Sequence, residues 1–311
     1  MVYGRPDHQL DLHQHIWTEP LLDALALRRG LPFVRRTDGL TVLHSAGERP
    51  YVIDVRSETP DRRTRLLHED RIDRALIALS SPIGIEALPE DAAAELIAAH
   101  LDGVLALGDE FAAWGPIAVE RPDPDQVDRL LARGCVGVSL PAGALAGDAA
   151  LARIGPILER VAISGVPLLV HPGPTAGQGT CEASLTEPLW WRALTDYVAQ
   201  MQAAWLTFAA HGRREHPRLA IVFAMLAGLA PLQSERLATR GDPSIDLRDP
   251  NAFYDTSSYG DEAIEAMARC VGAQQLAYGS DRPVIEPLAA RSDAALRANG
   301  ARLLASVGGA V

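Results

Sequence analysis

Short apolar runs alternate along this chain with longer stretches in which apolar residues recur at helical spacing. Runs of four to seven apolar residues are typical of strands in a parallel sheet that is covered on both faces. Counting a first strand near residue 13, we predict eight strands, the other seven over 74–79, 116–119, 135–140, 166–170, 218–224, 252–255 and 275–279. Eight such units with helices between them favour an α/β fold, a closed (β/α)8 TIM barrel.

Helical spacing predicts the segments that connect these strands. The expected helices cover 19–29, 62–70, 91–107, 125–133, 149–164, 188–210, 230–239 and 262–271. Residues 40–55 differ, because two apolar runs flank a polar turn there, and we predict a small β-hairpin-like insertion after strand 1. No shift in composition marks a boundary, so residues 1–311 are expected to form a single domain, a size common for α/β barrels.

The stretch Asp11-Leu12-His13-Gln14-His15 carries the first candidate chemistry. Side chains two apart on a strand point to the same face, so His13 and His15 would lie side by side. Two neutral imidazoles in that arrangement can bind a divalent transition metal. The alternative is that both are ordinary histidines of the core or the surface.

Two further residues favour the metal interpretation. His171 follows the strand predicted over 166–170, and Asp281 follows the last predicted strand. The carboxyl ends of barrel strands face one shared mouth, so these side chains are expected to converge on His13 and His15. Three imidazoles and a carboxylate predict a site for one divalent metal ion, foremost zinc, with manganese or iron as alternatives.

Charge and composition exclude several partners. The formal charge is −11, and all 29 basic residues are arginine because the chain has no lysine. A surface of that sign repels nucleic acid and anionic membranes. We see no signal peptide and no apolar run of membrane-spanning length, so we expect a cytoplasmic protein with a small-molecule substrate and a homodimer as a candidate state. The three cysteines lack C-x-x-C spacing and are expected to be structural thiols.

Together these motifs resemble the amidohydrolase superfamily, in the amidohydrolase-related branch that includes the metal-dependent aromatic and aminomuconate-semialdehyde decarboxylases. The resemblance extends from Asp11 to about residue 287, through D-x-H-x-H, the His-Pro-Gly turn at 171–173, the stretches 216–219 and 254–257, and Gly-Ser-Asp-x-Pro at 279–283. It implies a TIM barrel whose metal ligands are His13, His15, His171 and Asp281, the same four that the residues themselves indicate.

The chain departs from the pattern in two places. Many superfamily members bridge two metals with a carboxylated lysine, which a chain without lysine cannot do. The branch also usually has a histidine at the end of strand six that serves as acid/base or binds substrate. The matching stretch here is Ala-Met-Leu-Ala-Gly at 224–228, with Met225 in place of that histidine.

We therefore expect first a metal-dependent hydrolase of a small amide, lactone or cyclic ester, acting through a metal-activated water. Asp281 would be the catalytic residue that passes the proton to the leaving group. The alternatives are a non-oxidative decarboxylase of a small aromatic carboxylic acid and a catalytically impaired metal- or ligand-binding barrel.

The substrate pocket is expected to draw on residues of the mouth loops. Arg282 could bind a substrate carboxylate or form a structural ion pair. The remaining candidates for substrate binding are Trp17, Trp190, Trp191, Met225 and Tyr259. Of the other histidines, His8, His44, His68 and His100 are expected to be solvated, and His44 on the insertion could just reach the mouth. His211 and His216 precede strand six at the opposite end and are expected to be helix-end or surface groups.

Overall fold

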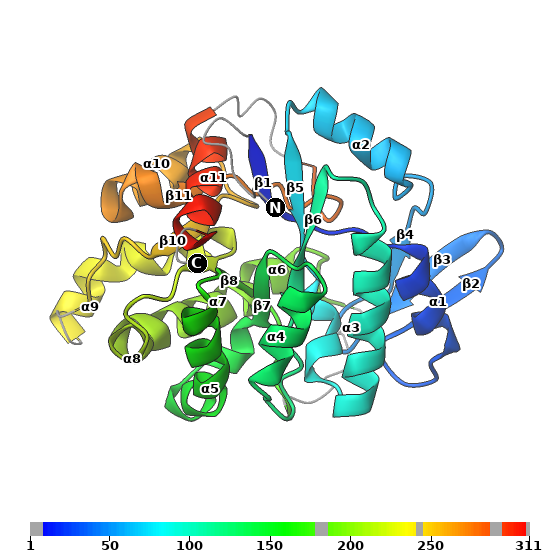
Figure 1. Cartoon of the computed structure of the whole chain (residues 1–311), viewed down its shortest axis with the longest axis horizontal. Helices are drawn as coiled ribbons and strands as arrows, with labels where there is room; N and C mark the ends of the chain where they lie inside the picture. The colour runs from blue at the N-terminus through cyan, green and yellow to red at the C-terminus, as the bar shows by residue number, and fades with distance from the viewer. Residues whose placement is uncertain (1–8, 178–185, 241–244, 287–293, 309–311) are drawn as a thin grey trace.

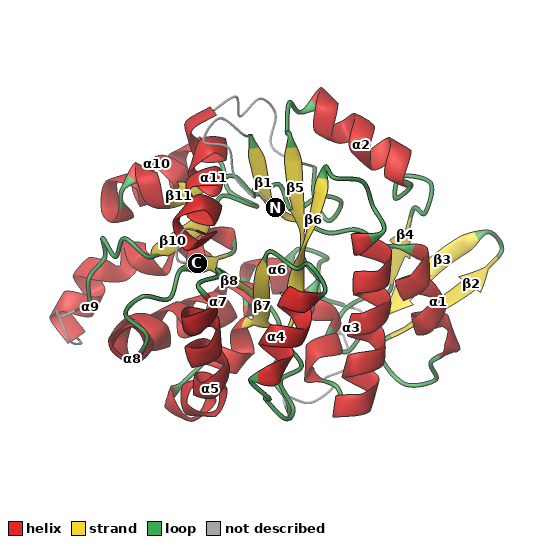
Figure 2. Cartoon of the chain, in the orientation of Figure 1, coloured by secondary structure: helices red, strands yellow, loops and turns green. Residues whose placement is uncertain are grey.

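Eight parallel strands form the central sheet of the chain (Figures 1 and 2). The computed structural model describes residues 9–177, 186–240, 245–286 and 294–308. The strands follow in the order β1 (Leu10–Gln14), β5 (Arg74–Ile77), β6 (Phe111–Pro116), β7 (Gly137–Pro141), β8 (Leu168–His171), β9 (Ile221–Phe223), β10 (Ala252–Asp255) and β11 (Leu276–Ala277). Backbone hydrogen bonds from Leu12 N to Tyr278 O and from Asp281 N to His13 O, both 2.9 Å, join the first strand to the last. The predicted (β/α)8 barrel is confirmed.

Helices surround this sheet (Figure 2). They are α1 (Glu19–Leu27), α2 (Pro60–Glu69), α3 (Glu90–Leu105), α4 (Asp125–Ala132), α5 (Asp148–Ser164), α6 (Trp191–Leu194), α7 (Asp196–Thr207), α8 (Arg213–Glu215), α9 (Ser234–Arg240), α10 (Asp261–Val271) and α11 (Ala294–Gly308). Short 3-10 turns cover Ser81–Ile83, Ile85–Ala87, Ala142–Leu145 and Ala273–Gln275, a left-handed turn opens the segment Met225–Gln233, and a π turn covers Phe208–Gly212. No described helix is both long and apolar enough to cross a membrane.

The alternation of side chains along each strand divides the core into two clusters. Val170 and Tyr254 belong to the larger cluster, which also contains the inward faces of the helices. Leu169 and Phe253 belong to the smaller one, together with Trp114 and Val222. Leu169 precedes His171 by two residues, and Phe253 precedes Asp255 by two. The strand faces that fill the barrel interior therefore also carry polar residues to its mouth.

The insertion after β1 is larger than the predicted hairpin. It has three antiparallel strands, β2 (Phe33–Thr37), β3 (Leu40–His44) and β4 (Tyr51–Ile53), which lie beside α1 (Figure 1). Sequence reasoning misses the first of these strands because its arginines hide the apolar pattern. The signal is present nevertheless, since Asp38 and Gly39 form a two-residue turn with φ of 49° and 78°, and Asp-Gly is a strong hairpin sequence.

Three other predicted segments are corrected. The third strand is Phe111–Pro116, because Pro116 ends this strand instead of beginning it. The helix expected over 188–210 breaks at Thr195 into α6 and α7. The helix expected over 230–239 begins only at Ser234, because a left-handed turn precedes it.

His100 also differs from expectation. It is predicted to be solvated, but it lies on the inner face of α3 with 1% of its surface exposed. Neither ring nitrogen has a hydrogen-bond partner among the described residues. Burial, together with the charge of His15, lowers the pKa of His100 to about 3. Helical spacing predicts the burial of His100 only weakly, because alanine and leucine residues surround it on every side of the helix and do not define one apolar face. His68 is exposed as predicted, and His8 and Cys181 lie outside the described residues.

This burial makes His100 a source of acid sensitivity. The unfolded chain binds a proton on this imidazole below about pH 6.5 and the folded chain does not, so the free energy of unfolding falls by about 1.4 kcal/mol per pH unit as pH decreases toward 3. We expect His100→Leu to remove this loss, a gain of about 2 kcal/mol at pH 5 relative to pH 7. Urea unfolding of the metal-free protein between pH 4.5 and 7 measures it. His68→Leu is the matched control and should retain the wild-type slope; an unchanged slope in His100→Leu would contradict the expectation.

Candidate metal centre

Four side chains from three parts of the chain meet at the mouth of the barrel. His13 and His15 come from the end of β1, His171 from the end of β8 and Asp281 from the loop after β11. One ligand atom from each lies within 4.8 Å of the others. The three imidazole rings are nearly perpendicular in pairs, with centroids 4.8 to 5.1 Å apart. All four residues are buried, Asp281 being the most exposed at 9%. The predicted convergence is therefore found.

Each imidazole of the cluster uses its Nδ1 in a hydrogen bond to the surrounding protein. His15 Nδ1 donates to Ala78 O at 2.8 Å, and His171 Nδ1 donates to Pro172 O at 2.9 Å. His13 Nδ1 donates to the Asp255 carboxylate at 2.8 Å. In the neutral rings each Nε2 is therefore a lone-pair acceptor.

Those acceptors point at one another. His13 Nε2 and His15 Nε2 are 3.1 Å apart, and the Asp281 carboxylate is 3.1 Å from His15 Nε2. Lone pairs and a negative charge at such distances repel unless a proton or a metal cation lies between them. Three nitrogens and one carboxylate oxygen are a ligand set that a divalent transition metal accepts. The residues present thus fit a metal ion chemically as well as in number.

Asp255 supports the cluster from behind His13. Its Oδ2 accepts a hydrogen bond from His13 Nδ1. Its Oδ1 accepts hydrogen bonds from the backbone N–H of Met225 and from both the N–H and the hydroxyl of Ser257. Burial alone would lower the pKa of His13, but the charges of Asp255, Asp281 and Asp11 outweigh it and raise the pKa to about 9. Metal-ligating histidines usually have such a partner. Sequence reasoning gives Asp255 no role, although its place at the end of the seventh predicted strand is a usable signal.

A bulge interrupts β1 at the segment that contains His13. Asp11 pairs with Ala75 and Gln14 with Ile77, so three steps along β1 match two along β5. The extra residue interrupts regular alternation, as β-bulges near active sites commonly do. The side-chain amide of Gln14, between the two histidines in sequence, donates to Asp11 Oδ2 at 2.8 Å.

Met225 begins a left-handed turn at the end of β9. Residues 225–229 all have φ between 49° and 62°, and only one of them is glycine. Such backbone costs roughly 1–2 kcal/mol for each non-glycine residue. The turn is held by the bond from Met225 N to Asp255 and by one from Gln202 Nε2 to Gly228 O at 2.8 Å. Met225 itself is buried, so the position predicted to bind substrate is fixed to the same carboxylate that supports His13.

The other predicted pocket residues lie in different settings. Trp17 is buried just after the two β1 histidines, with its ring centroid 6.4 Å from that of Tyr51. Tyr259 is half-buried after β10. Trp190 and Trp191 are 55% and 43% exposed at the start of α6. Their role toward a substrate remains a prediction.

Arg282 forms ion pairs within the protein, as in the second of the two roles considered for it. Its guanidinium lies 3.1 Å from Asp70 and 2.6 Å from Glu286. His44, the histidine of the insertion, stacks on Phe33 with ring centroids 4.7 Å apart. His211 and His216 precede β9 and lie near Asp148 and Glu159 of α5, at 3.5 and 3.4 Å.

The tip of the insertion contacts the beginning of α6 and α7. The Tyr197 hydroxyl donates to Glu48 at 2.7 Å, and Arg192 is 3.1 Å from the same carboxylate and also donates to Gly47 O. Since β1 and β8 are the first and fifth of eight strands, loops that follow them must cross the mouth to meet. Burial and the charge of Glu48 raise the pKa of Tyr197, and the charge of Asp281 adds to this. Sequence reasoning misses both Tyr197 and Glu48, because the contact joins residues 149 positions apart.

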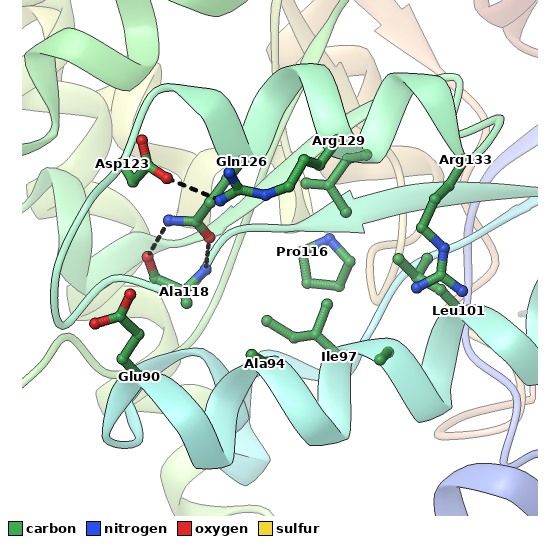
Figure 3. Close-up of a pocket in the computed structure, with 12 residues that line it drawn as sticks. Glu90, Ala94, Ile97, Leu101, Pro116, Ala118, Asp123, Gln126, Arg129 and Arg133 are labelled. Atoms are coloured by element: carbon green, nitrogen blue, oxygen red, sulfur yellow. Dashed lines mark hydrogen bonds and ion pairs between the residues drawn. The ribbon is translucent and has the colours of Figure 1, made fainter.

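A cavity of about 230 Å³ lies away from this mouth, between α3 and α4 (Figure 3). Its floor is apolar, formed by residues such as Ile97 and Pro116. The polar residues at its rim are paired: Gln126 with the backbone of Ala118, and Arg129 with Asp123 (Figure 3). It contains none of the metal-site residues, so we assign it to helix packing.

Comparison with known proteins places the fold. No family model matches the chain, and no curated protein matches its sequence. Among solved structures, IDCase from Metarhizium anisopliae aligns with a TM-score of 0.72 at 18% identity, over 98% of this chain and 99% of that one. A 5-carboxyvanillate decarboxylase from Novosphingobium aromaticivorans with bound manganese aligns with a TM-score of 0.70 at 16% identity, over 96% and 97%. The 2,6-dihydroxybenzoate decarboxylase from Rhizobium gives 0.65 at 17%, over 96% and 99%.

These likenesses establish a shared fold. A structure described as an amidohydrolase II also aligns, with a TM-score of 0.69 at 14% identity. The neighbours therefore agree with the branch that the sequence motifs resemble, and both the Novosphingobium and the Rhizobium proteins are named as decarboxylases of aromatic acids.

The raised pKa of His13 predicts how metal binding depends on pH. A metal ion must displace the proton from this ring, so the apparent affinity for one ion per chain should rise about tenfold per pH unit below pH 9 and then level off. Competition with a chelator of known proton affinity, using Zn²⁺ and Mn²⁺ between pH 6.5 and 9.5, measures this. His13→Ala should lose most of the bound metal. Two ions per chain, or an affinity that does not change with pH, would contradict this assignment.

Proposed function

We propose that this protein is a metal-dependent, non-oxidative decarboxylase of a small aromatic carboxylic acid. The observation that carries the proposal is the buried cluster of three lone-pair nitrogens and one carboxylate at the mouth of the barrel. Barrels of the same fold that are named decarboxylases support it, one of them with bound manganese. We place decarboxylation ahead of the hydrolysis that the sequence alone favours, because the fold neighbours favour the first.

In this proposal His13, His15, His171 and Asp281 hold one divalent ion, zinc or manganese. The ion would act as a Lewis acid that binds and polarises oxygen atoms of the substrate. Its three histidine ligands are fixed by their Nδ1 bonds, so the site is organised before substrate arrives.

Asp281 is the group proposed to move the proton. In decarboxylation the bond between the ring carbon and the carboxylate breaks, CO₂ leaves and a proton is added to that carbon. Asp281 is the most exposed of the four cluster residues and faces the mouth, where it can deliver this proton and take another from solvent. The thioether of Met225 carries no proton and would contribute only apolar contact to the ring.

Turnover of a defined panel tests the proposal. The metal-loaded protein is expected to release CO₂ from 5-carboxyvanillate, 2,6-dihydroxybenzoate or a related acid, and Asp281→Asn is expected to lower the rate at least about 100-fold. Metal content is measured in parallel, so that loss of the ion can be told from loss of the proton carrier. Hydrolysis of an ester, lactone or amide without CO₂ release would favour the hydrolase instead. Tight ligand binding with no turnover on any compound would indicate an impaired barrel.

Met225 allows a second test. Histidine occurs in left-handed backbone several-fold more often than bulky apolar residues do, so Met225→His should be accommodated at φ 52°. It would place a titratable group where the resembled branch usually has one. We expect an increase in kcat of at least about tenfold for a decarboxylated substrate and a new limb near about pH 6.5 in the rate profile. Met225→Ala is the matched control and should change mainly KM. A histidine variant with neither the increase nor the new limb would show that this position takes no part in proton transfer.

A further inference from the structure

A buried chain of polar side chains runs from α2 to the metal centre. Arg63 lies on α2 with 2% of its surface exposed, which is unusual for arginine. Its Nη1 donates to Glu58 at 3.1 Å and its Nη2 donates to Gln14 Oε1 at 2.7 Å. Gln14 Nε2 then donates to Asp11 Oδ2 at 2.8 Å.

The chemistry of these groups fixes the direction of each bond. A guanidinium can only donate and a carboxylate can only accept, so the Gln14 amide has one usable orientation between Arg63 and Asp11. Gln14 is the residue between His13 and His15 in the sequence. The chain of bonds therefore passes directly beside the two histidine ligands of β1.

The network ends on backbone N–H groups of the two segments that carry His13, His15 and Asp281, three of the four proposed metal ligands. Asp11 Oδ1 accepts the N–H of His13 at 3.0 Å and the N–H of Ser280, the residue before Asp281, at 3.1 Å. Glu58 accepts the N–H of Trp17, two residues after His15, at 3.0 Å. No described bond of this network reaches His171.

A second contact ties the same helix to the Asp281 loop. Arg282 pairs with Asp70, which directly follows α2, at 3.1 Å. Backbone bonds from Asp281 N to His13 O and from His15 N to Arg282 O, at 2.9 and 2.7 Å, join the loop to β1. Small displacements at this seam would separate ligand atoms that must stay within a few ångströms of one another.

We infer that Arg63 is a positioning residue of the metal centre, acting through Gln14 and Asp11 to hold the β1 histidines and the Asp281 loop in register. An arginine that only stabilised α2 would need a partner on the helix or its surroundings, and Glu58 alone would suffice. The further bond to Gln14 instead connects α2 to backbone next to the ligands. The inference depends on the metal centre and not on the proposed reaction.

Equilibrium metal binding tests this without any substrate. Arg63→Met should weaken Mn²⁺ binding at least about tenfold, as removal of outer partners of metal ligands commonly does, and Arg63→Lys should weaken it less because lysine can still donate. The matched control is Arg213→Met, which removes a largely buried arginine paired with Asp249 at 2.5 Å before β9, at the opposite end of the barrel. It should lower Tm but leave the Mn²⁺ affinity within about twofold of wild type.

A second variant tests the same network if Arg63→Met does not fold. Gln14→Met removes both bonds of the amide while keeping the guanidinium and its Glu58 partner, and should also weaken Mn²⁺ binding at least about tenfold. Hydrogen exchange of the His13 and Ser280 amides in the metal-free protein should be faster in this variant and unchanged in Arg213→Met. Mn²⁺ affinity within about twofold of wild type in both Arg63→Met and Gln14→Met would overturn the inference. An equal loss in Arg213→Met would also overturn it, because the effect would then reflect general destabilisation.

Discussion

Mutual repulsion among four acceptor groups is the constraint on which this site depends. Three imidazole nitrogens and the Asp281 carboxylate converge in a buried space, and with the rings neutral none of these four groups carries a proton. Such an arrangement persists only if the surrounding structure fixes each group or a cation neutralises it. The protein provides the first of these through a separate acceptor for each Nδ1: a carboxylate for His13, and backbone carbonyls for His15 and His171. The cation would provide the second.

The seam between β1 and the segment after β11 closes the barrel and assembles the site at the same time. The bond from Asp281 N to His13 O completes the ring of strands and sets two residues of the cluster beside each other. Asp11 reinforces the seam by accepting N–H groups from both sides. Stability of the barrel and geometry of the His/Asp cluster are therefore coupled.

Asp255 links the centre to the most strained backbone described in the chain. One of its oxygens accepts a hydrogen bond from the His13 ring N–H, and the other accepts one from the backbone N–H of Met225, where the left-handed turn begins. Local strain that persists is held by its surroundings and is frequent at functional sites. The substitution of methionine for the histidine usual in the resembled branch thus falls where the backbone is already unusual, and a single carboxylate serves both the ligand and the turn.

The sequence by itself determined the barrel, the position of the insertion and the four residues of the cluster. It could do so because apolar periodicity reports burial, and because the ends of parallel strands converge whatever the details of packing. Only the tertiary structure decided the bulge in β1, the burial of His100, the role of Asp255, and the contacts of Arg63 and Tyr197. Each of these depends on residues far apart in the chain, such as Gln14 with Arg63 or Glu48 with Tyr197. Local pattern cannot specify which distant side chains will meet, because their distance is set by how helices and loops pack around the barrel.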